Sequence, residues 1–339
     1  MVIEELDPAD AAEWDAYVAR SPGANCYHLH GWRAVGERGY GLRAPFLAAR
    51  SRPRGELLGV LPLFFIPGGY ATTGLFGAYG RVLAPDAGVG SALVEEACAR
   101  AERAGLASVR IKALGPEPSA PGFLPLDRWV IARLPLAESP QAAWGGLRGK
   151  VRNCVRKAQR FGFEVRTGPD EIAGFYDVLA ENMHRKGSPI YGLDWMRTLV
   201  ASLGAEVITL RLDGRTVSGA ITLTFNGVIT VPFASSRPAT FHMNPNNLLY
   251  WEIISRACSA GLHTLDFGRS LRDSSPLAFK LGWGAEMTPQ PLLVRALRGK
   301  PPAMNVESPM VRAMVALWQR LPRGLADALG PSVCRRWLA

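Results

Sequence analysis

The spacing of apolar and polar positions in the first 140 residues predicts a mixture of helices and strands. Trp14, Tyr17 and Val18, for example, recur at the 3.6-residue spacing of an amphipathic helix. The pattern predicts a helix over 10–20, a helix beginning within 27–32, strands over 46–49 and 57–65, a helix over 88–104 and a strand over 108–112. The Pro/Gly-rich residues 116–125 then predict a loop, so we expect a domain boundary between this loop and Trp144.

The following 150 residues show a similar succession, with a clearer hairpin. Asp213-Gly214 separates two apolar blocks and is a strong signal for a tight turn between antiparallel strands. The pattern predicts helices over 149–161, 169–186 and 194–202, strands over 206–212, 216–225 and 228–234, a helix over 246–260 and a strand over 263–267. This order is an α+β pattern, and its likeness to the first part indicates a duplicated fold.

Two segments bear on membrane contact. No charged residue occurs from Leu57 to Gly80, but Pro62, Pro67 and several glycines would break a spanning helix, so we expect buried strands and a loop. Residues 299–339 form a basic tail whose apolar positions recur at helical spacing. These positions are Met310, Val311, Met314, Val315, Trp318 and Leu321. The stripe is expected to pack against the body or, with its flanking arginines, to rest on anionic lipid.

Composition narrows the class of protein and its partners. A length of 339 residues with 48% hydrophobic and 20% charged residues suits two packed domains. The formal net charge of +10 favours an anionic partner, although a basic surface without a ligand is the alternative. The five cysteines are scattered and show no metal-ligand spacing, so we expect a reducing cytoplasm and no metal. The acidic residues 1–10 lack the apolar core of a secretion signal, which also favours the cytoplasm.

The predicted helix over 149–161 concentrates the positive charge. Its cations cover one broad face and leave Val151, Val155 and Phe161 for packing. The residues proposed to contact tRNA or another polyphosphate are Lys150, Arg152, Arg156 and Lys157. A merely solvated face is the alternative.

Several short motifs in the second part resemble the FemAB family. They are Asn182–Tyr191, Pro232–Ser236, Asn244–Glu252, Asp266–Ser270 and Phe279–Glu286. The resemblance is greatest to FemAB-like proteins associated with exosortase (PEP-CTERM) exopolysaccharide loci, and it extends over nearly the full length. It implies two tandem GNAT-like domains, which we place at 1–140 and 141–298, followed by the tail 299–339. It also implies N-acyl transfer: Fem transferases pass an aminoacyl group from aminoacyl-tRNA to an amine of a peptidoglycan precursor, and relatives use acyl-CoA.

This chemistry needs no covalent nucleophile, because an amine attacks an ester or thioester directly. Positioning, removal of the ammonium proton and positive charge near the oxyanion are sufficient. In Fem transferases the Phe-Lys pair lies at the reacting ester, so the resemblance assigns oxyanion stabilisation to Lys280 and substrate contact to Phe279. The alternative is a surface lysine on a strand that pairs with a carboxylate such as Glu286.

The other candidates surround this pair in the motifs. Asp266 and Glu252 are candidate bases, although Asp266 could instead pair with Arg269. Asn246 and Asn247 precede an apolar helix, and one of them is expected to cap it. The expected substrate-binding residues are Phe279, Arg269, Asn247, Tyr250, Tyr191, Ser235, Ser236, His28 and Trp32. Packing in place of binding is the alternative for Asn247, Tyr250, Tyr191, Ser235 and Ser236, and a helix-end role is the alternative for His28.

The sequence leaves three functions open. Gly88-Val89-Gly90 is a poor match to the pyrophosphate loop of CoA-dependent enzymes, because Pro85 occupies its first position. We therefore expect aminoacyl-tRNA as the co-substrate and an envelope or exopolysaccharide precursor as the amine acceptor, without a tightly bound cofactor. Acyl-CoA-dependent transfer and a non-enzymatic assembly factor are the alternatives. The expected location is the cytoplasm, with peripheral contact at the inner face of the membrane through the tail.

Overall fold

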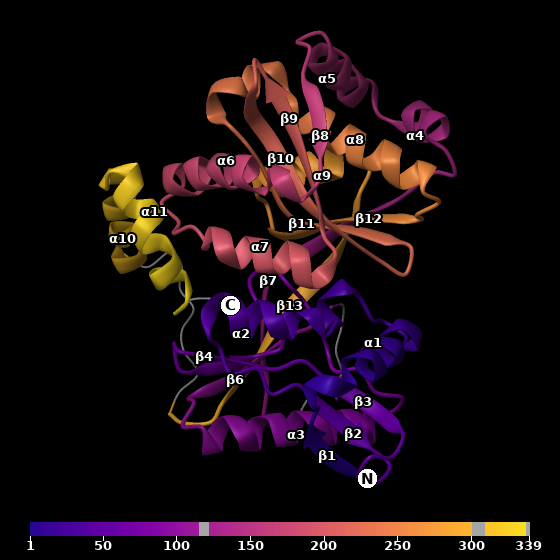
Figure 1. Cartoon of the computed structure of the whole chain (residues 1–339), viewed down its shortest axis with the longest axis vertical. Helices are drawn as coiled ribbons and strands as arrows, with labels where there is room; N and C mark the ends of the chain where they lie inside the picture. Colours follow the sequence, from indigo (N-terminus) through magenta and orange to yellow (C-terminus); the bar gives the residue numbers. More distant parts are fainter. Residues whose placement is uncertain (115–121, 300–308, 337–339) are drawn as a thin grey trace. The chain divides into compact units, whose positions relative to one another are not determined.

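The computed structural model describes residues 1–114, 122–299 and 309–336, and the chain divides into two compact units. Unit 1 comprises residues 1–130, 288–303 and 335–339, and unit 2 comprises residues 131–287 and 304–334. Figure 1 shows the elements of each unit. Two strands, β7 (Leu124–Pro135) and β13 (Glu286–Ala296), begin in one unit and end in the other.

Unit 1 contains two groups of strands and three longer helices. Its elements are β1 (Val2–Glu5), α1 (Ala11–Arg20), α2 (Gly31–Tyr40), β2 (Leu47–Arg50), β3 (Leu57–Leu61), β4 (Phe64–Ile66), β5 (Tyr70–Thr72), α3 (Ala87–Arg103) and β6 (Ser108–Lys112). Strands β1, β2 and β3 form an antiparallel sheet, and β4, β5, β6 and β13 are hydrogen-bonded in that order. Helix α3 packs against β2, β3 and β6, and buries Leu93 and Ala97 in an apolar core.

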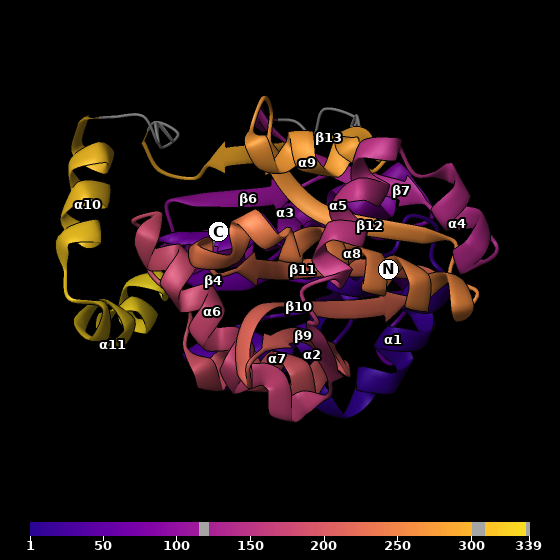
Figure 2. The same cartoon turned by 90° about the horizontal axis from the view of Figure 1, so that it is seen from above.

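Unit 2 also consists of helices and a sheet. Its elements are α4 (Pro140–Gly146), α5 (Gly149–Gln159), β8 (Glu164–Thr167), α6 (Ile172–Arg185), α7 (Leu193–Leu203), β9 (Glu206–Leu212), β10 (Arg215–Phe225), β11 (Val228–Ser236), α8 (Pro245–Ser259), β12 (Thr264–Leu271) and α9 (Ser275–Gly282). Its strands have the order β12-β11-β10-β9-β8. Helices α6 and α8 both pack on this sheet, and α4 and α5 pack on α8 (Figures 1 and 2).

Two tight turns produce the antiparallel part of this sheet. Asp213 and Gly214 both have positive φ, of 50° and 75°, and join β9 to β10 as the dipeptide predicted. Asn226 and Gly227, with φ of 45° and 74°, join β10 to β11. Such pairs of left-handed residues match the twist of the adjoining strands.

The predicted domain boundaries differ from this division. The second domain was expected to end at residue 298, but residues 288–303 belong to unit 1. The reason is that β13 pairs antiparallel with β6, from Leu292↔Lys112 to Ala296↔Ser108. The boundary expected near residue 140 falls inside β7, after Val130. Neither β7 nor β13 was predicted as a strand, and part of the predicted loop 116–125 lies outside the described residues.

The tail forms two helices that belong to unit 2, α10 (Pro309–Arg320) and α11 (Arg323–Cys334), and both contact α6. Arg323 donates to the Asp177 carboxylate, and His184 Nε2 lies 2.9 Å from the Leu321 carbonyl oxygen. The predicted stripe divides between two environments. Val311, Val315 and Trp318 are half-buried, whereas Met310 and Met314 are 73% and 52% exposed. Leu317, beside them, is 65% exposed.

Among the described residues, no helix has both the length and the apolar character needed to cross a membrane. The uncharged stretch from Leu57 to Gly80 instead contains β3, β4 and β5, which are almost entirely buried. This confirms the expectation of buried strands. All five cysteines are free thiols.

Candidate active site

Strands β11 and β12 of unit 2 run parallel but pair over only a short distance. Their register is Val228↔Thr264, Ile229↔Leu265 and Thr230↔Asp266, although the strands continue to Ser236 and Leu271. Gly268, with φ of +71°, lies where the pairing has ended. Backbone groups that no neighbouring strand satisfies need other partners. On the β11 side of β12 the pairing ends before Gly268, and the carbonyl oxygens of Gly268 and Arg269 accept hydrogen bonds from a side chain.

Lys280 occupies that position. It lies in the last turn of α9, is 7% exposed, and its Nζ donates to the carbonyl oxygens of Gly268 (2.9 Å) and Arg269 (3.2 Å). An ammonium group has three N–H donors, so one remains after these two bonds. Burial lowers the pKa of Lys280 to about 8, and the negative charge of Asp266 opposes this shift. The alternative of a surface lysine on a strand is thus wrong: Lys280 is buried, on a helix, and bonded to carbonyls.

Asp266 belongs to β12, lies near Lys280 and is fully buried. Its Oδ1 accepts from the Gly268 N–H at 2.7 Å, and its Oδ2 accepts from Arg133 Nε at 2.9 Å. Donors thus occupy both oxygens of this carboxylate, and its negative charge favours the protonated form of Lys280. The structure therefore brings Asp266 to the predicted site in a supporting arrangement, and Arg133 is the cation that reaches its Oδ2.

An aromatic cluster covers the helical side of the same region. The Tyr250 ring lies 5.0 Å from Phe267 and 5.4 Å from Phe279, and Trp283 lies 6.2 Å from Phe279, between ring centroids. Burial raises the pKa of Tyr250, so its phenol stays protonated and can donate. Two buried polar atoms here, Ser270 Oγ and Trp283 Nε1, have no hydrogen-bond partner among the described residues. Such atoms are rare in folded proteins and are candidates for substrate contact.

A chain of small polar side chains lines the end of β11. Asn182 Nδ2 donates to Ser235 Oγ at 3.0 Å. The Ser236 hydroxyl lies 2.6 Å from Ser218 Oγ and 2.6 Å from Asn246 Oδ1. The two predicted serines are therefore buried, with Ser235 bonded to α6 and Ser236 to the start of α8.

Helix α8 begins differently from the prediction. Asn244, in the left-handed region with φ of +60°, occupies the N-cap position, and its side chain makes no capping bond. Asn246, which was one of the two expected caps, accepts from Ser236 instead. The first N–H groups of α8 are therefore left without a side-chain cap, a feature that attracts anions. Asn247 is half-buried in this first turn.

Glu252 does not share the face of α8 that carries Tyr250. Two residues along a helix correspond to a rotation of about 200°, so the two side chains point to nearly opposite sides. Its neighbour Trp251 packs on Trp144 of α4, with ring centroids 4.7 Å apart. Desolvation raises the pKa of Glu252. Helical geometry therefore places this carboxylate on the side of α8 away from Tyr250.

The other predicted substrate-binding residues, Tyr191, His28 and Trp32, contact neighbouring protein groups. The half-buried Tyr191 ring lies 5.4 Å from Phe233, and burial raises its pKa. His28 belongs to unit 1, is fully buried, and its Nε2 lies 3.0 Å from the Arg81 carbonyl oxygen. Trp32 Nε1 donates to the Cys26 carbonyl at 2.9 Å. In unit 1, therefore, both motif residues are engaged in packing and capping.

The basic helix is present, and α5 buries Val151, Val155 and Ala158. The prediction that Phe161 packs was wrong, because Phe161 lies beyond the end of α5 and is 36% exposed. Lys150, Arg156 and Lys157 are exposed, and the half-buried Arg152 donates to the Gly145 carbonyl at 3.0 Å. The guanidinium of Arg156 lies 5.5 Å from the Trp144 ring.

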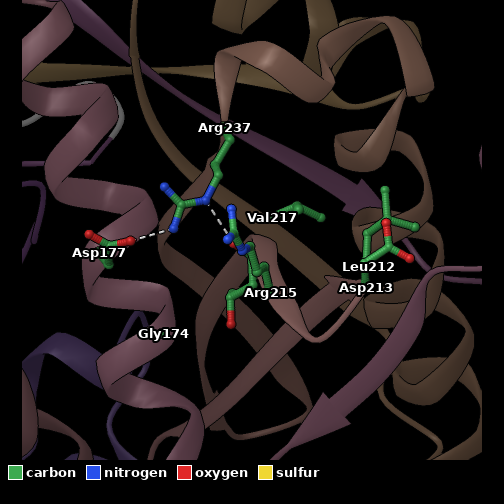
Figure 3. A pocket seen from close by; sticks show the side chains of 8 residues that line it. Gly174, Asp177, Leu212, Asp213, Arg215, Val217 and Arg237 are labelled. Carbon is green, nitrogen blue, oxygen red and sulfur yellow. Dashed lines mark hydrogen bonds and ion pairs between the residues drawn. The ribbon is translucent and has the colours of Figure 1, made fainter.

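An open hollow of about 840 Å³ lies between α6 and the β9–β10 turn, and none of the predicted site residues is among its lining residues. Figure 3 shows its lining, with Arg237 reaching across to Asp177 of α6 and Arg215 close by. Arg237 also donates to Glu181, and Arg323 of α11 reaches the same Asp177. This network of ion pairs joins the end of β11, α6 and the tail. We therefore assign it a role in stability and not in substrate binding.

Sequence reasoning missed several members of the site. Asn182 lies inside a quoted motif, and only the contact with Ser235 shows its place. Ser218 and Arg133 carry no local signal, because Arg133 meets Asp266 across 133 residues. Among the described residues, no group of three His, Cys, Asp or Glu side chains is placed to hold a metal ion.

Comparison with protein families gives this geometry a context. Residues 145–280 match the family model described as an acetyltransferase (GNAT) domain. This segment is therefore similar to a GNAT-type domain. It contains the β11–β12 divergence and ends at Lys280. No curated protein is significantly similar to the chain in sequence.

Solved structures resemble the whole chain. FemX matches with a TM-score of 0.68 and 15% identity, over 94% of this chain and 100% of FemX. A C-terminal domain assigned to a lysylphosphatidylglycerol synthetase of Agrobacterium fabrum matches with a TM-score of 0.59 and 13% identity, over 92% and 95%. A tandem GNAT protein from the clavulanic acid biosynthesis pathway matches with a TM-score of 0.60 and 13% identity, over 88% and 99%. At these identities the likeness shows the fold, which confirms the predicted GNAT-like architecture. With the GNAT domain match, these findings support an acyltransferase.

Proposed function

We propose that this protein is an N-acyltransferase that forms an amide bond, taking an aminoacyl group from aminoacyl-tRNA and passing it to an amine of a cell-envelope or exopolysaccharide precursor. The observation that carries the proposal is the buried ammonium group of Lys280, held by two carbonyls at the divergence of β11 and β12. The resemblance to FemAB proteins and the structural likeness to FemX support the choice of donor.

In the proposed reaction the acceptor amine attacks the carbonyl carbon of the ester that joins the amino acid to the terminal ribose. A C–N bond forms, and the remaining N–H of Lys280 stabilises the tetrahedral oxyanion. The C–O bond then breaks, and the ribose oxygen leaves with the proton that the amine gives up. Asp266 acts through Lys280, because its charge favours the ammonium form. Tyr250, Ser270 and Trp283 offer donors and a wall for the substrate.

The test traces labelled amino acid from aminoacyl-tRNA into an alkali-stable product, since an amide survives the base treatment that hydrolyses the donor ester. Purified protein, charged tRNA and an extract containing envelope precursors are combined, with Lys280→Met as the control. We expect transfer that RNase pretreatment of the donor abolishes. Transfer that is indifferent to RNase would overturn the proposed donor.

Acyl-CoA is the second candidate donor, and the uncapped start of α8 is the observation in its favour. A helix N-terminus binds phosphate groups without a fixed motif. Against it, Pro245 at the first helical position removes one N–H donor. Acetyl-CoA below 1 mM, on the order of a typical KM, should raise the melting temperature if this candidate is correct. An unchanged melting temperature argues for the tRNA donor.

A non-enzymatic assembly role is distinguished by genetics. Complementation of a deletion strain by Lys280→Ala and Asp266→Ala proteins would favour such a role over both enzymes. We expect neither variant to complement, because each removes a charge from the site.

We further propose that the tail rests on anionic lipid at the inner face of the membrane. Met310, Met314 and Leu317 form an exposed apolar stripe, and Arg312 and Arg320 lie on the same helix. Amphipathic helices of this type bury their apolar face at the lipid boundary. Flotation with anionic vesicles should fall in a Met314→Glu/Leu317→Glu variant, and unchanged flotation would refute the contact.

A further inference from the structure

A group of aromatic side chains, two exposed and one half-buried, lies beside the basic helix of unit 2, and the proposed chemistry does not use it. Phe161, just beyond the end of α5, is 36% exposed, and its ring meets that of the exposed His242 at 6.4 Å between centroids. Phe163 lies 6.3 Å from Phe161. We call Phe161, Phe163 and His242 the ring cluster.

The ring cluster is surrounded by positive charge. Lys157 and Arg160 precede Phe161 in the chain, and both are exposed. Phe241, next to His242, is 44% exposed and lies 6.0 Å from the Arg185 guanidinium. Exposed aromatic faces among cations suit a ligand that has both flat apolar groups and negative charges. Single-stranded nucleic acid has both, because bases stack on rings while phosphates contact Lys and Arg.

The ring cluster also lies close to the site along the chain. His242 belongs to the 3-10 helix Pro238–Met243, which joins β11 to α8. Three residues separate it from Asn246, whose side chain contacts Ser236 at the end of β11. The interplanar angle of 85° between Phe161 and His242 is an edge-to-face contact, so the two rings are not stacked face to face on each other.

We propose that the ring cluster stacks the unpaired bases at the 3′ end of the donor RNA and so delivers the aminoacyl ester to Lys280. This inference rests on the proposed tRNA donor and adds the surface that holds its single-stranded end. The cations of α5 then contact the phosphates without reading the sequence. Stacking is tolerant of base identity, so the surface would accept tRNAs of different sequence.

The test compares two RNAs that carry no amino acid. One is a complete tRNA, and the other is the same tRNA without its unpaired 3′-terminal nucleotides. Binding is measured by fluorescence anisotropy with full-length protein at two salt concentrations. We expect wild type to prefer the complete tRNA, and Phe161→Ala or His242→Ala to lose on the order of 10-fold in affinity for it alone. Lys157→Ala should weaken both RNAs and reduce the salt dependence. Leu329→Ala, which trims another exposed apolar side chain, on α11, is the matched control and should change nothing.

The outcomes separate this inference from the proposed donor. If the ring variants keep the full preference for the complete tRNA, stacking by the ring cluster is refuted while the donor proposal stands. If wild type binds neither RNA at low salt, the donor proposal fails and the inference fails with it. In that case, binding to phosphatidylglycerol vesicles that Phe161→Ala weakens would assign the surface to lipid. Equal melting temperatures of all variants establish that each is folded.

Discussion

Each unit contains a pair of parallel strands with a buried lysine at its end, yet the two lysines have different surroundings. In unit 1, β5 pairs with β6 from Tyr70↔Ser108 to Thr72↔Arg110, and Lys112 ends β6 with 1% exposure. Its Nζ donates to the Phe76 carbonyl at 2.5 Å. In unit 2, β11 pairs with β12 over three residues, and Lys280 reaches β12 from a separate helix.

The two units differ in the groups that lie beyond the end of the parallel pairing. In unit 1 the chain from residue 73 to residue 80 continues along β6: Thr73 N donates to the Arg110 carbonyl, and Gly80 N donates to the Lys112 carbonyl. Main chain thus occupies the place beside the strand end. In unit 2 the carbonyls of Gly268 and Arg269 are met by the Lys280 side chain, which keeps one donor. A pair of parallel strands is therefore followed by main chain in unit 1 and by a lysine side chain in unit 2.

Replacing each lysine by methionine tests this comparison most strongly. We expect Lys280→Met to lower the single-turnover rate of transfer by about 10²–10³-fold, the typical effect of losing one oxyanion donor. Lys112→Met should leave the rate within a few-fold. It should instead lower the free energy of unfolding by about 1–3 kcal/mol, because the Phe76 carbonyl loses its buried partner. Equal losses of rate in both variants would contradict the assignment of the chemistry to unit 2.

Acid should destabilise unit 1 through His28. Burial lowers the pKa of this histidine from 6.5 to about 4, so between these values the unfolded chain binds a proton that the folded chain does not. The free energy of unfolding therefore falls as pH drops from about 6.5 towards 4, by up to about 3 kcal/mol. Hydrogen exchange of unit 1 amides at pH 7 and 4.5 measures this loss. A His28→Gln variant should lack the pH dependence; if it keeps it, another group is responsible.

Alkali should act on unit 2 through Lys280. With a pKa of about 8, its ammonium form is lost above that pH, so the rate should fall about tenfold per pH unit from 8 to 10. Stability moves in the other direction, because the unfolded lysine holds its proton up to about 10.5, and unfolding becomes less favourable as pH rises through 8. Lys280→Arg keeps its charge and should show no alkaline fall in rate. A fall that persists in this variant would show that a different group titrates.

The smallest expected effect on stability comes from the tail. Its two helices pack on unit 2, which is a second difference between the units. Arg323 joins α11 to Asp177 of α6, and both groups are partly exposed. Arg323→Ala should therefore cost no more than about 1 kcal/mol and should speed amide exchange mainly in α11. Arg320→Ala, on the exposed side of α10, is the control. Faster exchange throughout unit 2 would mean that the tail stabilises the whole unit.

Local pattern was sufficient for most elements of unit 2. Asp213-Gly214 and Asn226-Gly227 specify their turns through residues that adopt positive φ, and apolar spacing located α5, α6 and α8 to within a few residues. It failed for β7 and β13, whose partners lie far away in sequence, as β13 shows by pairing with β6 across about 180 residues. The domain boundaries shifted for the same reason.

Within the site, the sequence by itself determined which residue types are available, through the motifs that contain Asp266, Lys280, Tyr250 and the two serines. The tertiary structure decided how they act. Only the fold shows that Arg133 engages Asp266, that Glu252 points to the other side of α8, and that Lys280 meets two carbonyls. Both carbonyls follow the point at which β11 and β12 part, after three pairs. Such a divergence depends on how strands from distant parts of the chain pack, and no local spacing of residues encodes it.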